Sequence, residues 1–78
     1  MDIHHIHGTE VGFDHGTEDA RSFLGHSENS HVARGYLEQA EKHGEAHFYA
    51  TDGSKYTIKH ELGEDGKSIF SVNKSHHN

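Results

Sequence analysis

The sequence predicts a small α+β domain in which one or two N-terminal helices pack on a three-stranded antiparallel β-meander. Two Asp-Gly pairs, at 52–53 and 65–66, separate segments of alternating hydrophobicity, which is a strong signal for β-hairpins. Apolar residues recur at helical spacing between residues 17 and 43. A chain of 78 residues has room for one domain, so we expect a single core over residues 1–78.

The composition indicates a folded chain with a thin core. Only fourteen of the 78 residues are Ile, Leu, Val or Phe, but the formal net charge of −6 is modest for a disordered chain. Such a small core favours stabilisation by a second copy or by a partner. The absence of cysteine excludes disulfides and thiolate zinc sites. The first residues lack the pattern of a signal peptide and no apolar run is long enough for a membrane span, so we expect a cytoplasmic protein.

Residues 1–16 are expected to be irregular, or to hold a short edge strand over 2–7. The tetrad His-Gly-Thr-Glu occurs twice, at 7–10 and 15–18, which is too few copies for a repeat architecture. In the second copy, Thr17 is a suitable cap for a following helix, because Glu18 and Asp19 would lie in its first turn.

Two helices are expected within residues 17–43. In the first, over 18–24, Ala20, Phe23 and Leu24 share one face, and Gly25 suits a left-handed end. The second, over 30–43, ends at Gly44. Gly35 in its middle either permits a close backbone contact or is merely tolerated. The apolar stripe of this second helix consists of Val32, Ala33, Tyr36, Leu37 and Ala40.

The meander is expected over residues 46–73, with a frayed tail over 74–78. Three-residue loops ending in Gly53 and Gly66 align the apolar residues of all three strands on one face, whereas two-residue loops would mix the faces. This register pairs Phe48 with Tyr56 and Ile58 with Val72. The predicted buried face consists of Ala46, Phe48, Ala50, Tyr56, Ile58, Leu62, Phe70 and Val72, with His60 at its edge.

Histidine is the outlying residue, with eleven copies. One hypothesis is a transition-metal site, since imidazole and carboxylate ligands suit zinc, copper or nickel. The opposing interpretation is compositional bias with exposed imidazoles. A second hypothesis is a response to pH, because protonation of all eleven histidines would change the formal charge from −6 to +5. The candidate metal ligands are His5, His7, Asp14 and His15.

Neither catalysis nor nucleic-acid binding is the preferred interpretation. The sequence has no nucleophile elbow, phosphate-binding glycine loop or cysteine nucleophile, so we expect no enzyme and no cofactor. Residues 1–44 carry three basic against eight acidic side chains, which disfavours a phosphate backbone as partner. The open sheet face nevertheless keeps a nucleic-acid alternative, with Tyr49 for stacking and Lys55, Lys59 and Lys67 for charge.

The favoured function is non-catalytic binding of a protein, as an inhibitor or adaptor. Candidate partners are a basic nucleic-acid-binding protein and a second copy of the chain, and the size is typical of phage and mobile-element proteins. Tyr49, Lys59 and Ile69 are expected on the solvated sheet face. Glu38 and Glu41 are expected on the second helix, where negative charge would accelerate association with a basic surface.

Overall fold

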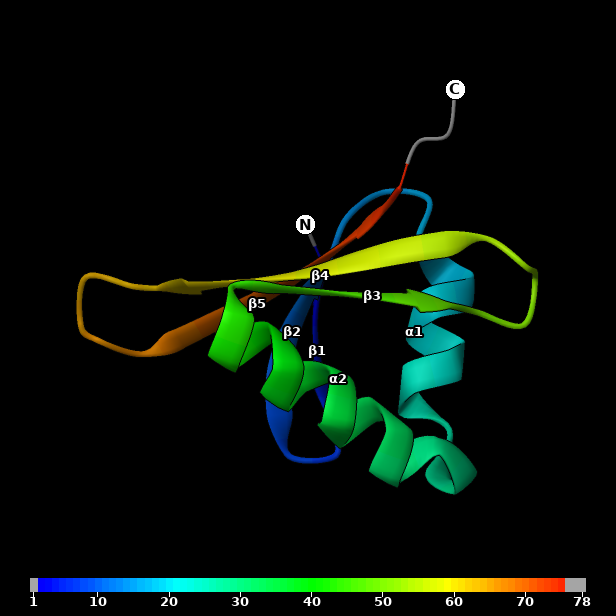
Figure 1. Cartoon of the computed structure of the whole chain (residues 1–78), viewed down its shortest axis with the longest axis horizontal. Helices are drawn as coiled ribbons and strands as arrows, with labels where there is room; N and C mark the ends of the chain where they lie inside the picture. Colours follow the sequence, from blue (N-terminus) through cyan, green and yellow to red (C-terminus); the bar gives the residue numbers. More distant parts are fainter. Residues whose placement is uncertain (1, 76–78) are drawn as a thin grey trace.

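The computed structural model describes residues 2–75, which form two α-helices, one 3₁₀ helix and five strands (Figure 1). In chain order these are β1 (Asp2–Ile6), β2 (Thr9–Phe13), α1 (Glu18–Gly25), η1 (Ser27–Asn29), α2 (Ser30–His43), β3 (Glu45–Tyr49), β4 (Lys55–Leu62) and β5 (Ser68–Lys74). The α+β class is therefore confirmed.

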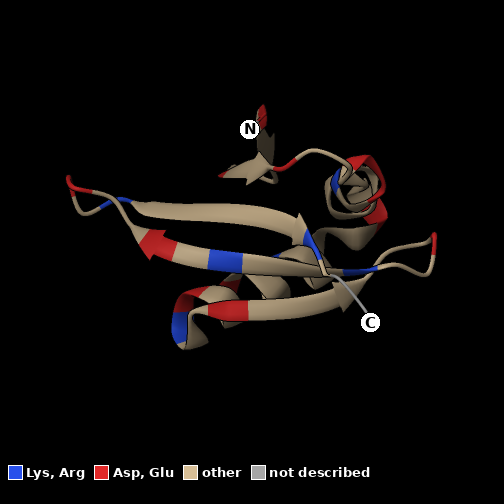
Figure 2. Cartoon of the chain, turned by 90° about the horizontal axis from the view of Figure 1, so that it is seen from above, with Lys and Arg blue, Asp and Glu red and all other residues tan. Residues whose placement is uncertain are grey.

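The strands form one mixed sheet in the order β1-β2-β5-β4-β3. The predicted three-stranded antiparallel meander, β3 to β5, is only part of this sheet, so the prediction was wrong in strand number and in strand direction. The N-terminal hairpin of β1 and β2 joins the meander beside β5, and β2 and β5 are parallel. Figures 1 and 2 show this hairpin running across the direction of the meander strands, on the β5 side.

The short edge strand expected over 2–7 is present as β1, at the edge of the sheet, but the second strand of the hairpin, β2, was not predicted. The two-residue turn of the hairpin consists of His7, with φ 50°, and Gly8, with φ 89°. Two successive left-handed residues are typical of the type I′ turn, which matches the twist of antiparallel strands. The second His-Gly-Thr-Glu tetrad also turns at its glycine, Gly16, with φ 83°. The chain then enters α1, so the same four residues lead once into a strand and once into a helix.

The parallel contact between β2 and β5 connects the two ends of the chain. Val11 lies beside Phe70 and Phe13 beside Val72, and the Asp14 amide donates to the Val72 carbonyl at 3.1 Å. Val11 and Phe13 are buried, so β2 adds two large apolar side chains to the face that the meander already buries.

The predicted register of the meander is confirmed. Phe48 lies opposite Tyr56 and Ile58 opposite Val72. Each turn ends in a left-handed glycine, Gly53 with φ 81° and Gly66 with φ 82°. The Asp-Gly pair in each loop and the alternation of apolar residues were thus enough to predict the strand register, because a slip of one residue would expose the apolar face.

Two details at the ends of α1 were predicted wrongly. Thr17 immediately precedes the helix, but its hydroxyl makes no capping bond and instead donates to the Asp14 carbonyl at 2.6 Å. Gly25 is the last helical residue and does not have the expected left-handed conformation. A Cβ at this position would lie 3.6 Å from Cδ1 of Ile6, so Gly25 marks where α1 approaches β1.

The second helix has the predicted bounds and ends at left-handed Gly44, with φ 91°. A Cβ added at Gly35 would meet open space. No close backbone contact therefore requires this glycine, and the helix merely tolerates it. The helix packs on β3 and β4, and Ala33, Leu37 and Ala40 of the predicted stripe are buried there. Val32 was predicted wrongly as part of this stripe and is 45% exposed.

An aromatic cluster fills the core between the helices and the meander. The Phe48 ring lies 5.7 Å from Phe23, 5.3 Å from Tyr36 and 5.6 Å from Tyr56, measured between ring centroids. Leu62 was predicted wrongly as part of this core and is 70% exposed. The Gly44 carbonyl accepts a hydrogen bond from the His60 amide, which places the end of α2 beside His60. Beyond this point the β4–β5 hairpin extends past the helix, so α2 does not cover Leu62 (Figure 1).

Lys74 and Ser75, the first two residues of the predicted frayed tail over 74–78, are held by the sheet. Lys74 belongs to β5, and the Ser75 amide donates to the Lys55 carbonyl at 2.9 Å. The remainder of that predicted tail, residues 76–78, lies outside the described residues. Among residues 2–75, no helix has the length and apolar character needed to cross a membrane.

Candidate functional site

Tyr49, Lys59 and Ile69 lie on the sheet face opposite α2, which we call the open face. Tyr49 is 61% exposed and Ile69 is 48% exposed. Tyr49 lies opposite Lys55 and Ile69 opposite Glu61. These two positions are six residues apart along β4, or about 20 Å. The three predicted contact residues are therefore spread along the open face and do not form one patch.

Ile69 has a different apolar neighbour, Ile3, which was not predicted from the sequence. Ile3 of β1 lies opposite Gly12 of β2, and Gly12 lies beside Ser71 of β5. A cavity of about 70 Å³ opens here and is lined by Ile3, Gly12 and Ile69 among others. Because glycine has no side chain, the two isoleucines flank a shallow depression. We call Ile3, Gly12 and Ile69 the isoleucine patch.

Lys59 lies among carboxylates. Glu45 is directly opposite it on β3, and Glu61 follows it on the same face of β4. Figure 2, which views the meander from above, shows basic and acidic positions interspersed along its strands. The strands of the open face carry Lys55 and Lys59 against Glu10, Glu45 and Glu61. This balance of charge does not favour a nucleic-acid backbone.

A short hydrogen-bonded chain crosses the open face. The Thr57 hydroxyl is 2.9 Å from Nδ1 of His47 and 2.7 Å from the Ser75 hydroxyl. Nε2 of His47 lies 3.7 Å from a Glu45 carboxylate oxygen. The order acid, imidazole, hydroxyl matches that of a nucleophilic triad. However, Thr57 is only 8% exposed, and its hydroxyl is shared between His47 and Ser75. We therefore interpret these hydrogen bonds as structural contacts that orient the side chains on the sheet.

Glu38 and Glu41 are exposed on α2, on the other side of the sheet from Tyr49, Lys59 and Ile69. The helix also carries Arg34 and Lys42, at four-residue spacing from Glu38, which offsets the negative charge. The structure therefore does not bring the predicted acidic and sheet-face residues into one site.

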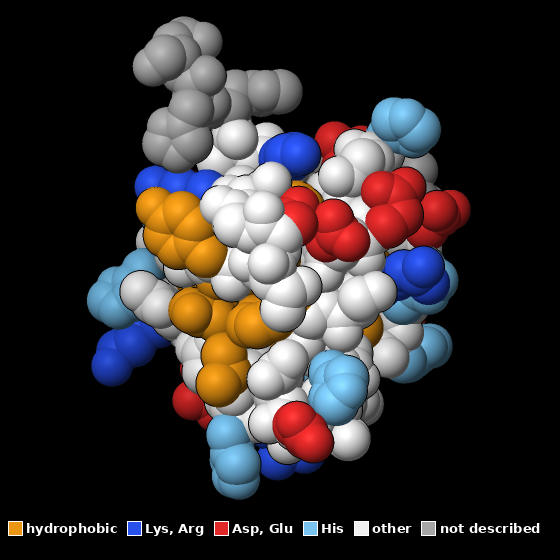
Figure 3. Space-filling model, turned by 90° about the vertical axis from the view of Figure 1, so that its right-hand side faces the viewer, with side chains coloured by type: hydrophobic (Ala, Val, Ile, Leu, Met, Phe, Trp, Pro, Cys, Tyr) orange, Lys and Arg blue, Asp and Glu red, His pale blue; other side chains and the backbone are white. Residues whose placement is uncertain are grey.

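The acidic side chains gather instead where α1 begins. Figure 3 shows them on the end of the molecule that carries α1 and the β3–β4 turn, beside a hydrophobic area. Asp52 accepts hydrogen bonds from the Ser54 amide at 3.0 Å and from the Tyr56 hydroxyl at 3.2 Å. The hydrogen bond from the Ser54 amide is the main cause that lowers the pKa of Asp52. The pKa of Asp19 is raised, because Asp19 interacts with the Asp52 side chain and lies near its negative charge. Burial, followed by the charge of Asp52, raises the pKa of Tyr56.

The candidate metal ligands do not converge. Nε2 of His7 is 2.8 Å from the Leu24 carbonyl, so this imidazole donates to the end of α1. His5 lies 4.0 Å from Glu10, and Asp14 accepts from the His15 amide. Within residues 2–75, no group of three or more His, Cys, Asp or Glu residues is arranged to hold a metal ion.

His60 occupies the predicted position at the edge of the buried face. Among the described residues, no group bonds to its buried Nε2. The His60 ring lies 5.0 Å from the Phe70 ring, so ring packing is the contact that holds it.

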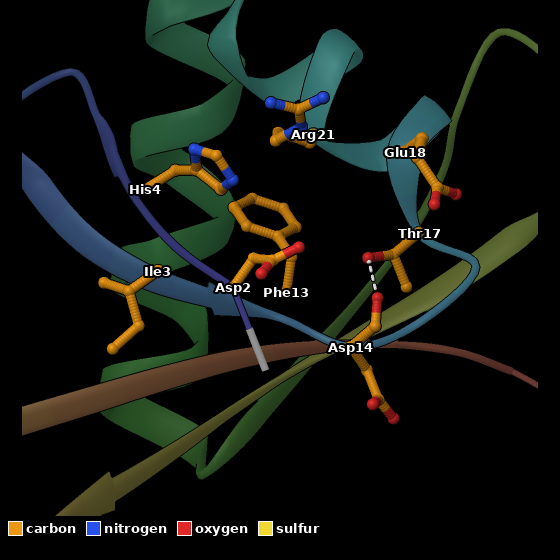
Figure 4. A pocket seen from close by; sticks show the side chains of 8 residues that line it. All are labelled: Asp2, Ile3, His4, Phe13, Asp14, Thr17, Glu18 and Arg21. Carbon is orange, nitrogen blue, oxygen red and sulfur yellow. Dashed lines mark hydrogen bonds between the residues drawn. The ribbon is translucent and has the colours of Figure 1, made fainter.

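A groove between β1 and α1 was not anticipated from the sequence. Two cavities, of about 390 Å³ and 480 Å³, lie along it and share His4 and Arg21. Figure 4 shows His4 on the β1 side and Arg21 on the α1 side, with the Phe13 ring below them and the Asp2 carboxylate beside that ring. The groove arises because α1 packs beside the hairpin, and the hairpin itself had not been predicted.

No protein-family model, curated protein or solved structure matches this chain. Its function is therefore inferred from the arrangement of its own residues.

Proposed function

We propose that this chain is a non-catalytic protein-binding domain and that the isoleucine patch on the open face is the centre of its contact surface. One observation carries the proposal: exposed Ile3 and Ile69, 66 positions apart in the sequence, flank Gly12 on a sheet face opposite the helix α2. Apolar side chains gathered on an exposed surface, with polar groups around them, are characteristic of protein contact sites.

The charges around the patch favour a protein over a nucleic acid. Glu10 lines the depression itself, and Glu61 lies directly opposite Ile69. A nucleic acid would bring phosphates close to these carboxylates, whereas a protein surface can offer lysine or arginine there. Tyr49 and Lys59 extend the proposed surface along the meander.

The partner class that the charge favours is a basic protein, on which the domain acts as an inhibitor or an adaptor. The formal net charge of −6 attracts such a partner from a distance. In this proposal Glu38 and Glu41 contribute to long-range attraction, and the isoleucine patch forms the buried contact. A second copy of the chain is the competing partner.

The test compares two exposed residues of the same hairpin. Ile69→Ser removes an isoleucine of the patch, and Leu62→Ser removes a similarly apolar side chain that is 70% exposed outside it. The wild-type chain and both variants are used to capture proteins from cells of the source organism, with cross-linking to locate the contact. Loss of one captured protein with Ile69→Ser but not with Leu62→Ser supports the proposal.

Sedimentation velocity of the same three proteins tests the second copy as partner. Self-association that is lost only with Ile69→Ser assigns the patch to a homodimer. If Ile69→Ser alters neither self-association nor capture, the patch is not the contact surface and the proposal fails.

A further inference from the structure

We propose that the groove between β1 and α1 is a second binding site, which takes an extended basic peptide segment of a partner as a sixth strand of the sheet. This site shares Ile3 with the isoleucine patch, which uses its side chain, whereas the groove uses its backbone. Three features of the groove carry the inference: a strand edge with unpaired backbone, a facing wall formed by α1, and an excess of negative charge.

The first feature is the outer edge of β1. This strand is the last in the sheet and has a neighbour, β2, on one side. The two-residue turn closes on Ile6 and Thr9, which form a hydrogen-bonded pair in a hairpin of this type. Because such pairs alternate along antiparallel strands, Ile3 and His5 direct their backbone N–H and C=O groups away from β2. Groups of this kind bind added strands in many peptide-recognition domains.

The second feature is the wall that α1 forms beside this edge. The cavity near Asp2 and His4 also contacts Glu18 and Arg21. The cavity near Ile6 also contacts Arg21 and Gly25. The strand and the helix therefore run in the same direction on the two sides of the groove.

The wall formed by α1 covers most of the length of β1. The five residues of β1 span about 16 Å in extended conformation, and the eight residues of α1 span about 12 Å. A peptide of four or five residues would fill the groove while its backbone pairs with Ile3 and His5. The far end of the groove is closed, because α1 approaches Ile6 at Gly25 and His7 bonds to the Leu24 carbonyl.

The third feature is the charge of the cavity nearest the start of β1. It is lined by the carboxylates of Asp2, Asp14 and Glu18 and by one basic group, Arg21. Figure 4 shows the Asp2 carboxylate toward the middle of this cavity, with Asp14 and Glu18 farther out. A lysine or arginine of the bound strand would lie against these carboxylates, so the occupant is an extended segment that contains basic residues.

The experiment uses NMR titration of the full chain with three capped pentapeptides. The first alternates valine and lysine, the second alternates valine and glutamate, and the third is the lysine peptide with proline at its centre. We expect the lysine peptide to shift the amide signals of Ile3, His5 and Arg21. The glutamate and proline peptides should bind at least about ten-fold more weakly, because they lack the charge or the backbone donor respectively.

Two variants test the groove itself. Ile3→Pro removes an outward-directed N–H at an edge position that tolerates proline, and it should weaken the lysine peptide about ten-fold. The double variant Asp2→Asn, Glu18→Gln keeps the backbone and both side-chain shapes, and it should reduce the preference for lysine over glutamate by at least about five-fold. Ile69→Ser should leave peptide binding unchanged, which separates this site from the isoleucine patch.

Three results would overturn the inference. The first is a set of shifts around Tyr49 and Ile69 with none at Ile3 and His5. The second is equal affinity for the lysine and proline peptides, which would exclude strand pairing. The third is the absence of any saturable shift with the lysine peptide at about 1 mM, the weak end of specific affinities.

Discussion

The Tyr56 hydroxyl donates a hydrogen bond to Oδ2 of Asp52 across 3.2 Å, and it thereby links a core ring to the turn that precedes it. Tyr56 is 1% exposed and its ring packs against Phe48. Asp52 also accepts from the Ser54 amide within the turn. The same carboxylate therefore stabilises the turn and satisfies the polar end of a buried aromatic residue.

Tyr56→Phe should lower the free energy of unfolding by about 1 to 2 kcal/mol, because it removes a hydrogen bond to a charged acceptor and keeps the ring. Urea denaturation followed by circular dichroism measures the change. Tyr49→Phe is the matched control, since its hydroxyl lies on an exposed residue, and it should change stability by less than about 0.5 kcal/mol. Equal effects of the two substitutions would contradict the role of the Asp52 bond.

The pH dependence of stability should show two opposing contributions in the acid range. The folded-state pKa of Asp52 is lowered, so its stabilising contribution is present above its unfolded pKa and is lost as pH falls through the folded pKa. The folded-state pKa of Asp19 is raised, so folding is favoured while Asp19 is protonated, and this contribution is lost as pH rises through that pKa.

Asp19→Asn should consequently make the protein more stable than wild type at pH 7, and the difference should disappear near pH 3, where Asp19 is protonated in both states. Glu28→Gln removes one negative charge elsewhere and serves as the control. Thermal unfolding between pH 3 and pH 7 measures both variants. A constant difference across this range would show that Asp19 and Asp52 do not interact as described.

His7 combines two roles that a pair of substitutions can separate. It occupies a left-handed position, with φ 50°, and its imidazole bonds to the Leu24 carbonyl. His7→Asn loses the bond but tolerates the backbone conformation, so it should cost about 1 kcal/mol. His7→Ala loses the bond and adds the left-handed strain, for a total of about 2 to 3 kcal/mol. Denaturant unfolding that finds the two variants equally stable would contradict the type I′ turn.

Two glycines of the α2 region should respond in opposite directions to the same substitution. Gly35→Ala should raise the free energy of unfolding by about 1 kcal/mol, because the site is helical and the new methyl group meets open space. Gly44→Ala should lower it by about 1 kcal/mol or more, because φ is 91° there. Melting temperatures of the two variants give the comparison. A loss of stability with Gly35→Ala would mean that the helix contacts something at this point.

The double variant Glu38→Lys, Glu41→Lys should slow association with a basic partner and flatten its dependence on salt, while the dissociation rate changes little. Stopped-flow or surface-based kinetics over a range of ionic strengths measures both. The control Gln39→Lys adds one positive charge on the same helix without removing a carboxylate. Association rates that are the same for wild type and the double variant would remove α2 from the proposed attraction.

The meander and both helices were predictable because their signals are local. Asp-Gly loops, alternating apolar residues and Gly44 each act within a few residues of the chain. The position of Ile69 on the open face followed from the same alternation. Leu62 shows the limit of this reasoning: its side chain points to the predicted face, but the helix that would cover it ends near His60.

The N-terminal hairpin and the parallel pairing were not predictable from local pattern. Only Val11 and Phe13 alternate in β2, and the strand contains Gly12, which weakens its signal. The pairing of Val11 with Phe70 depends on residues 59 positions apart, and no local pattern reports it. The isoleucine patch and the β1–α1 groove both depend on this hairpin, so they were missed for the same reason. The one sequence signal for this hairpin was the dipeptide His7-Gly8, which forms its turn between Ile6 and Thr9.

The central strand of the sheet, β5, is also the last of the five strands in chain order, so it is synthesised after the other four. Until it arrives, β1 with β2 and β3 with β4 are two separate antiparallel pairs, and a pair of this size is marginally stable alone. Assembly of the sheet therefore waits for a strand that pairs with β4, which directly precedes it, and with β2, which is made much earlier. The contact between β2 and β5 makes folding depend on distant residues and slows it. A nascent or prematurely terminated chain would present two exposed inner edges, those facing β5 in the finished protein, and so would be prone to pair with other chains.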